Sequence, residues 1–165
     1  MTKFIIRWAK PGDGLTLYNL IMALAVFERA PHAVKTTAET IDFQLAEETP
    51  PFECLLAESQ AGEAIGFALF FHTYSTWEGK RGIHLEDLFV RPAARRYGVG
   101  RALLARLAQI TIQRNCRRLE WSVLDWNKLA LTFYDSLHAE TMSQWCNQRL
   151  SGRRLERLAG MSKPV

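Results

Sequence analysis

A short glycine-containing turn between a strand and a helix is the feature that most restricts the fold of this 165-residue chain. Ile83–Val90 (IHLEDLFV) is apolar enough for a strand, which Pro92 ends. Arg95–Gly100 (RRYGVG) follows, and the apolar residues of Val99–Asn115 recur at helical spacing. Two glycines permit a tight bend, and a helix N-terminus adds unsatisfied N–H donors and a positive dipole end. The segment therefore predicts a cradle for a phosphate group.

Two better-known nucleotide motifs do not match this turn. A dinucleotide fingerprint needs a third glycine near Leu103, and a P-loop needs Gly-Lys-Ser or Gly-Lys-Thr after its glycines. A glycine turn before a helix also occurs as plain structure without a ligand. The turn by itself leaves both interpretations open.

The rest of the chain alternates between strand-like and helical patterns, with no internal repeat and no linker. Antiparallel strands come first, and a strand, helix, strand and helix follow, which indicates an α+β fold with a mixed central sheet. We expect one domain over residues 3–158 and a short C-terminal tail over 159–165. The expected strands are Lys3–Ala9, Phe52–Glu58, Ala64–Thr73, Ile83–Val90, Leu119–Val123 and a late strand at Trp145–Leu150. The expected helices run from Asp13, a candidate N-cap, to about Arg29, from a capping box at Thr36–Glu39 toward Glu48, over Val99–Asn115 and over Leu129–Leu137.

Composition narrows the classes of partner. The net charge of +4 permits an anionic ligand, but no stretch interleaves the arginines with the stacked aromatic residues of single-strand nucleic-acid binders. The longest apolar run, near Leu20–Val26, is far shorter than the ~20 residues of a membrane span. Three scattered cysteines and four histidines lack metal-ligand spacing, so we expect no metal and assign the histidines no role. We expect no nucleic-acid or membrane partner and a cytoplasmic location.

The segments around the turn resemble the GNAT superfamily of acetyl-CoA-dependent N-acetyltransferases. The resemblance rests on Leu85–Pro92 (LEDLFVRP), then Arg95–Gly100, then Asp125–Leu137 (DWNKLALTFYDSL). Within the superfamily the chain is most similar to the spermidine/spermine (diamine) acetyltransferase branch, through KFIIRWA at its start, LIMALAVFE in its first helix and Trp77–Lys80 (WEGK). The match covers the chain in order from Lys3 to about Leu158.

The resemblance implies a mixed, mostly antiparallel and splayed central sheet flanked by helices, and a homodimer. Acetyl-CoA would lie in the opening between the strands at Ile83–Val90 and Leu119–Val123. The residues implied for acetyl-CoA are Leu88, Phe89 and Val90 along the pantetheine arm, Arg95, Arg96, Tyr97, Gly98, Val99, Gly100 and Arg101 around the pyrophosphate, and Asn127.

Amine acetylation needs two proton transfers. An alkylammonium with a pKa near ~10.4 must lose a proton before it attacks, and the leaving thiolate must gain one. Glu86 is the candidate proton acceptor, acting through water, and the resemblance gives Tyr134 the role of proton donor to the sulfur. By strand alternation Glu86 and Asp87 point to opposite faces, so both reach one site only if the strand bulges there. Without these roles, Tyr134 is a core aromatic and the two acids are surface charges.

The acceptor is expected to be a primary amine of a small di- or polyamine or a lysine-like amine. Local acidity in a basic protein would draw such a cation, and a tryptophan would cover its methylene chain. Phe27 stands where the polyamine branch often has Tyr, which weakens the polyamine interpretation, and His138 replaces a glycine common after the last helix. The expected acceptor contacts are Phe27, Glu28, Trp77, Glu86 and Asp87.

Three other functions stay open at this point. The chain could be a GNAT enzyme for another amine, such as an aminoglycoside or a protein amine. It could be a non-catalytic CoA-binding module, although it retains Glu86 and Tyr134. It could also use its arginines on nucleic-acid phosphates, which a stability shift with DNA instead of acetyl-CoA would reveal.

Overall fold

The computed structural model describes residues 3–162, which divide into two compact units between Ser122 and Val123. The first unit contains β1 (Phe4–Trp8), α1 (Gly14–Phe27), the 3-10 helix η1 (Pro31–Ala33), α2 (Ala38–Leu45), β2 (Glu53–Ser59), β3 (Ala64–Ser75), β4 (Lys80–Val90), the 3-10 helix η2 (Pro92–Ala94), α3 (Val99–Gln113) and β5 (Leu119–Trp121). The second unit contains α4 (Lys128–Asp135) and α5 (Arg153–Ala159).

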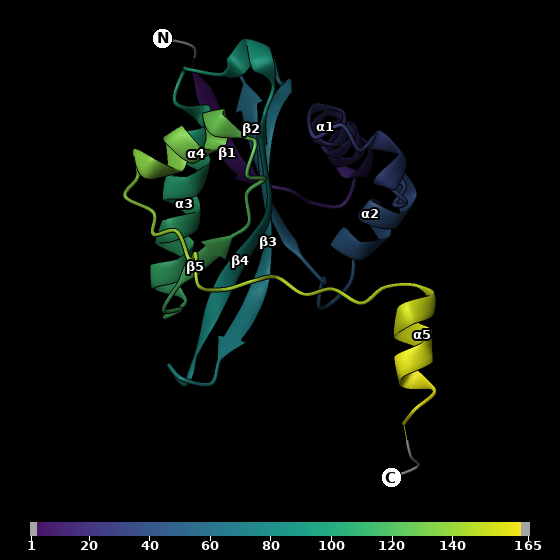
Figure 1. Ribbon diagram of the computed structural model, residues 1–165. Coiled ribbons are helices and arrows are strands. Elements are labelled where there is room, and N and C mark those ends of the chain that lie inside the picture. The colour runs from purple at the N-terminus through teal and green to yellow at the C-terminus, as the bar shows by residue number, and fades with distance from the viewer. Residues whose placement is uncertain (1–2, 163–165) are drawn as a thin grey trace. The chain divides into compact units, whose positions relative to one another are not determined.

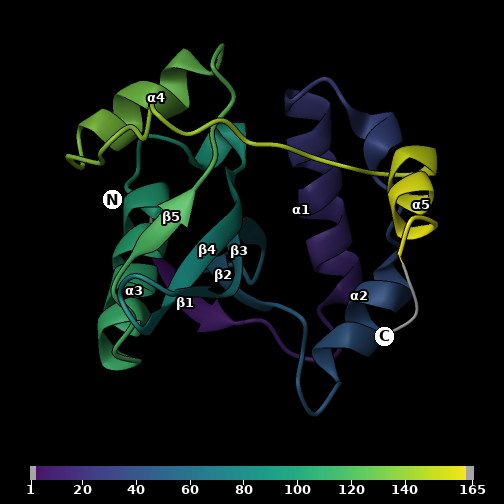
Figure 2. The same cartoon turned by 60° about the horizontal axis from the view of Figure 1, so that its bottom comes forward.

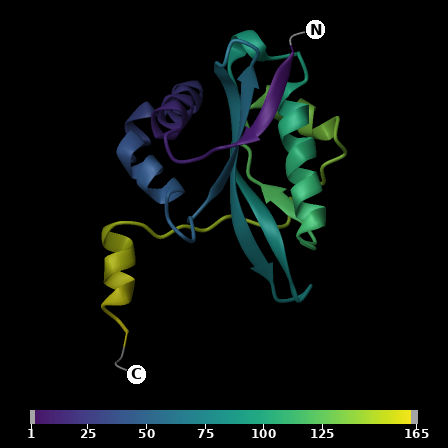
Figure 3. The ribbon, with the colours of Figure 1, turned by 180° about the vertical axis from the view of Figure 1, so that it is seen from behind.

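The first unit is a five-stranded sheet between two helical layers. The strands follow in the order β1-β2-β3-β4-β5, all antiparallel except the parallel pair β4 and β5. Helices α1 and α2 cover one face and α3 covers the other (Figures 1 and 2). The long β3–β4 hairpin continues past the end of its β2 partner (Figure 3). The expected mixed, mostly antiparallel α+β sheet is confirmed.

The apolar core lies on both faces of this sheet. Leu17, Leu20 and Leu24 of α1 are spaced by three and four residues, so one helical stripe faces the sheet. On α3, Leu103, Leu107 and Ile110 form a corresponding buried stripe. Side chains alternate along each strand, and each face therefore receives every second residue. The cluster under α1 and α2 consists of Leu17, Leu20, Leu24, Ile41, Cys54, Leu56, Phe67, Leu69 and Phe89.

Tertiary contacts replace the expected cap of α1. Asp13 occupies the N-cap position, but its side chain makes no cap hydrogen bond. Both of its carboxylate oxygens accept from Arg7 instead, at 2.7 and 2.9 Å. The Asp42 carboxylate of α2 accepts from the backbone N–H groups of Gly12 and Gly14 at 2.7 and 2.9 Å. A side chain from α2 therefore satisfies donors at the start of α1.

The N-cap of α2 lies one residue later than expected. Thr37, not Thr36, is the N-cap, and its hydroxyl accepts from Thr40 N at 3.2 Å. Glu39 therefore falls one position too early to close the box. The helix itself begins where the pattern predicts it.

Two predictions about the C-terminal region are wrong. Residues 145–150 form no strand, and no segment in this range joins the five-stranded sheet. The unexpected helix α5 follows, with Leu155 and Leu158 three residues apart. β5 ends at Trp121 instead of Val123. None of the helices within residues 3–162 is long and apolar enough to cross a membrane.

Candidate active site

The site begins at a fork where β5 leaves β4. β5 pairs with Ile83, His84 and Leu85 and ends at Trp121. β4 continues to Val90, and no strand within residues 3–162 continues the pairing on that edge. Backbone N–H and C=O groups at a strand edge can pair with an extended amide-containing chain. Leu88, Phe89 and Val90, the residues expected along the pantetheine arm, occupy this part of β4.

A bulge at Glu86 sets the orientation of the acids on β4. Leu69 is opposite Asp87 while Phe70 is opposite Leu85, so Glu86 is the extra residue. Asp87 follows the face of Leu69, which belongs to the core cluster beneath α1. The bulge that the sequence required for Glu86 and Asp87 to reach one site is therefore present.

Three carboxylates share this electrostatic neighbourhood. Burial, together with the charges of Glu86 and Glu28, raises the pKa of Asp87 to about 6. Burial also raises the pKa of Glu28, at the C-terminal end of α1. Proximity of like charges makes ionisation of all three unfavourable. A bound ammonium group would relieve that repulsion, so this cluster suits a cationic ligand.

His84 joins this group, although the sequence analysis assigned it no role. Its Nε2 lies 3.7 Å from Oε2 of Glu86. The bulge places His84 and Asp87 on the same face, since Phe71 is opposite His84 and Leu69 is opposite Asp87. His84 and Glu86 are two residues apart in a predicted strand, and this spacing was the sequence signal that their side chains lie close together.

The glycine turn has the geometry of an anion cradle. Gly98 is the N-cap of α3 with φ of 84°, a left-handed conformation that favours glycine, and an added Cβ there would meet open space. Arg96 also has a positive φ of 66°. The exposed side chains of Arg96, Tyr97 and Arg101 surround the start of α3. This arrangement fits the pyrophosphate predicted from the sequence.

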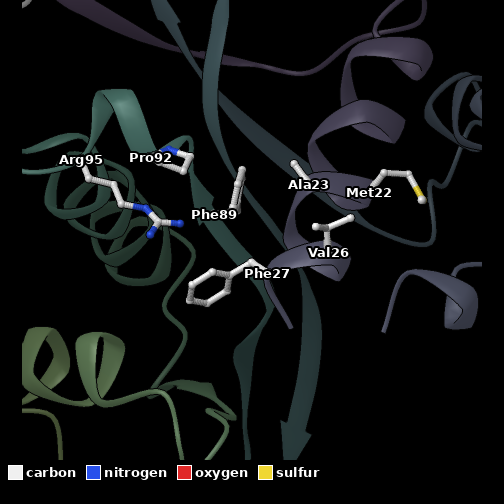
Figure 4. Close-up of a pocket in the computed structure, with 7 residues that line it drawn as sticks. All are labelled: Met22, Ala23, Val26, Phe27, Phe89, Pro92 and Arg95. Carbon is white, nitrogen blue, oxygen red and sulfur yellow. The ribbon is translucent and has the colours of Figure 1, made fainter. Parts of the chain in front are cut away.

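Arg95 takes a different direction from the one expected. Its Nε donates to the Val90 carbonyl at 2.9 Å, and its guanidinium carbon lies 5.0 Å from the centre of the Phe27 ring and 5.7 Å from that of Phe89. The guanidinium reaches toward the space between the two rings (Figure 4). Arg95 thus links the turn to β4 and α1. It lines an apolar pocket of about 440 Å³ with Met22, Ala23, Val26, Phe27, Phe89 and Pro92.

Trp77 lies apart from the acidic cluster within this chain. It occupies the turn between β3 and β4 and is 91% exposed. The seven-residue step along β4 from Lys80 to Asp87 spans about 23 Å at ~3.3 Å per residue. The fold therefore brings Glu28, Glu86 and Asp87 together and leaves Trp77 at the far end of the hairpin.

The second unit holds the other two residues expected at the site. Asn127 is the N-cap of α4, and its Oδ1 accepts from Ala130 N at 3.1 Å. Tyr134 lies on α4, and its ring centre is 5.4 Å from that of Phe133. His138 adopts φ of 58°, the left-handed conformation that the usual glycine would take, and Ala139 N donates to the Tyr134 carbonyl at 3.2 Å. The helix therefore ends as a glycine-terminated helix does.

A mixed sheet with a glycine-containing turn after its fourth strand is the arrangement that the resemblance to N-acetyltransferases implied. Residues 16–139 match the model of the acetyltransferase (GNAT) family. The chain belongs to that family and is an N-acetyltransferase. Members of the family take their acetyl group from acetyl-CoA.

Similar proteins agree with this assignment, and a solved structure agrees with the fold. The chain is 36% identical to a thialysine N-epsilon-acetyltransferase of Bos taurus, over 97% of this chain and 99% of that one. It is 35% identical to an L-ornithine N5-acetyltransferase of Arabidopsis thaliana, over 92% and 86%. An integron cassette protein of V. cholerae superposes with a TM-score of 0.80 at 25% identity, covering 96% and 98%.

Proposed function

We propose that this enzyme acetylates the terminal primary amine of a small di- or polyamine or of a lysine-like amine. The cluster of Glu28, Glu86 and Asp87 beside the β4–β5 fork carries the proposal, because it favours a cation where acetyl transfer is expected. Relatives that act on thialysine and on ornithine support a lysine-like acceptor. Phe27 offers no hydroxyl to a polyamine, so we expect spermidine to be a poorer acceptor than a shorter amine.

Acetyl-CoA is the proposed acetyl donor. Backbone groups at Leu88–Val90 would hold the pantetheine arm, and the N–H groups at Arg96–Arg101 would hold the pyrophosphate. The left-handed Gly98 and the first turn of α3 support this assignment. The thioester supplies an acyl group that is activated toward amines.

The side chains of this protein would handle the protons. Glu86, exposed on the bulge, would accept the proton of the ammonium group through water. Tyr134 would donate to the departing sulfur, as the resemblance implies, with Asn127 contacting the donor. Phe27, Glu28, Asp87 and Trp77 would contact the acceptor. For Trp77, 91% exposed at the hairpin tip, that role would require a partner chain.

Assembly, extent and location are further parts of the proposal. We infer a homodimer with one catalytic domain over residues 3–158, acting in the cytoplasm. The resemblance to diamine acetyltransferases supports the dimer, and relatives matched over nearly their whole length support a domain of this size.

An acceptor panel tests the proposed function by following CoA release. The panel contains lysine, thialysine, ornithine, cadaverine, putrescine, spermidine, pentylamine, an aminoglycoside and a peptide with a free N-terminus. We expect turnover of lysine-like amines and short diamines. Turnover of the peptide or the aminoglycoside alone would refute the proposal.

A substitution on α1 tests the acidic cluster. Glu28→Gln should raise KM for the dicationic cadaverine more than for the monocationic pentylamine, because one attractive charge is lost. Added salt should reduce that difference. Glu63→Gln, in the exposed β2–β3 turn, is the control. Equal effects of Glu28→Gln on the KM values of both amines would show that Glu28 does not contact the acceptor.

A further inference from the structure

His84 occupies the point where the sheet divides. On one side its partner is Phe71 of β3, and on the other it is Glu120 of β5. Only the next residue, Leu85, still pairs with β5 among the described residues. The imidazole therefore lies directly before the unpaired edge of β4 along which acetyl-CoA is proposed to bind.

The contacts of His84 direct it toward the acids. Its ring centre lies 5.2 Å from that of Phe71, and its side chain is 28% exposed. Its Nε2 lies 3.7 Å from Oε2 of Glu86. This distance is too long for a direct hydrogen bond, but a small movement of the exposed Glu86 would close it. The ring is thus supported on one side while one nitrogen is turned to the acceptor cluster.

Charged groups of β4, α1 and β5 occur in this part of the sheet. Glu86 and Asp87 follow it on β4, and Glu28 at the end of α1 acts on the same Asp87. From β5, Glu120 is opposite His84, but its carboxylate accepts from Arg118 Nε at 2.8 Å. The carboxylate nearest to this imidazole is therefore that of Glu86, whereas the carboxylate on β5 is already paired with Arg118.

We propose that His84 is a positioning residue behind Glu86, which passes to it the proton of the acceptor ammonium group. The inference rests on the proposed function, since it needs an amine acceptor at the cluster. In general an imidazole is a stronger base than a carboxylate, with reference pKa values near ~6.5 and ~4.3, and it is therefore the better proton acceptor. In this arrangement the Glu86 carboxylate binds the cation. The His84 imidazole behind it holds the proton that the cation releases.

The proton balance of the step is complete. The ammonium group gives one proton to Glu86, which passes it to Nε2 of His84. The free amine attacks the thioester carbonyl, the C–N bond forms and the C–S bond breaks. The second proton leaves the amide nitrogen for the thiolate. His84 then returns its proton to solvent, so one amine cation and acetyl-CoA give one amide, CoA thiol and one proton.

The pH dependence of kcat/KM for lysine tests this role. In wild type we expect a rising limb near neutral pH, separate from the limb of the amine itself at higher pH. His84→Asn should lower kcat at pH 7 by about 10²-fold, remove the neutral limb and regain activity at high pH or with added imidazole. His84→Gln provides a second test should the first variant fold poorly. His72→Asn is the control, because this histidine lies beside Glu53 and Arg114, away from the cluster.

Each result has a distinct meaning. The stability shift caused by acetyl-CoA should be unchanged in both His84 variants, which shows that donor binding and fold are intact. A wild-type profile without the neutral limb, or a variant with wild-type kcat and profile, overturns the role of His84. Absence of turnover by wild type with every amine of the panel refutes the proposed function instead.

Discussion

Asp87 provides a quantitative test of the acidic cluster. Its pKa is raised from an ordinary 3.8 to about 6, first by burial and then by the charges of Glu86 and Glu28. The folded protein thus holds this proton more tightly than the unfolded chain does. The stability contributed by the protonated form is fully present below pH 3.8 and is lost as pH rises through about 6.

Asp87→Asn removes the ionisation and keeps the shape of the side chain. The difference of about 2 between the two pKa values corresponds to about 3 kcal/mol at 1.36 kcal/mol per pKa unit, an upper limit because Asp87 is only partly buried. We therefore expect the variant to be more stable than wild type by about 1–3 kcal/mol at pH 7.5. We expect almost none of this gain at pH 3.5.

Urea unfolding at a series of pH values measures this difference. Glu86→Gln is the matched variant, since loss of one neighbouring charge should move the Asp87 transition to lower pH without removing it. Lysine or cadaverine should stabilise wild type more than Asp87→Asn, because a cation favours the ionised carboxylate. A stability gain that is the same at pH 3.5 and pH 7.5, or a variant less stable than wild type at both, would show that the surroundings do not raise the pKa of Asp87.

Four further substitutions test other parts of the structure. Tyr134→Phe should lower kcat by about 10²–10⁴-fold with an unchanged Kd for acetyl-CoA, and steady-state kinetics with calorimetry would show whether Tyr134 only packs. Gly98→Val should cost about 1–2 kcal/mol of stability through its positive φ and weaken acetyl-CoA binding in calorimetry, and unaltered affinity would contradict the cradle. Asp42→Ala should cost about 1–3 kcal/mol in urea unfolding, because the N–H groups of Gly12, before α1, and Gly14, its first residue, lose their acceptor, and KM values should not move. His138→Gly should raise stability in the same assay by about 1 kcal/mol, and a loss would mean that the imidazole itself stabilises the turn.

Local patterns predicted the helices better than their ends. The apolar spacing of Leu17, Leu20 and Leu24 predicted α1, but Asp13 does not cap it, because Arg7 from β1 binds both of its oxygens. The cap comes from Asp42, twenty-eight residues beyond Gly14. No local rule anticipates a donor–acceptor pair formed across that separation.

The orientation of the Arg95 side chain is a second feature that local sequence rules do not predict. Its place in the turn predicted a contact with pyrophosphate. From the sequence alone, this side chain cannot be distinguished from those of Arg96 and Arg101. In the fold its guanidinium lies against Phe27 and Phe89, which α1 and β4 bring together. The late strand expected at residues 145–150 is also absent, because a local apolar pattern does not decide whether a segment pairs with a distant strand.

The sequence by itself determined the strand, turn and helix of Ile83–Gln113 and the family to which the chain belongs. These depend on glycines, apolar spacing and short-range order, which each segment carries within itself. Only the tertiary structure decided that β4 bulges at Glu86, that β5 leaves at Leu85 and that Glu28, His84 and Asp87 gather there. Register and proximity depend on pairing between distant segments, and a one-residue slip reverses the face of every side chain that follows.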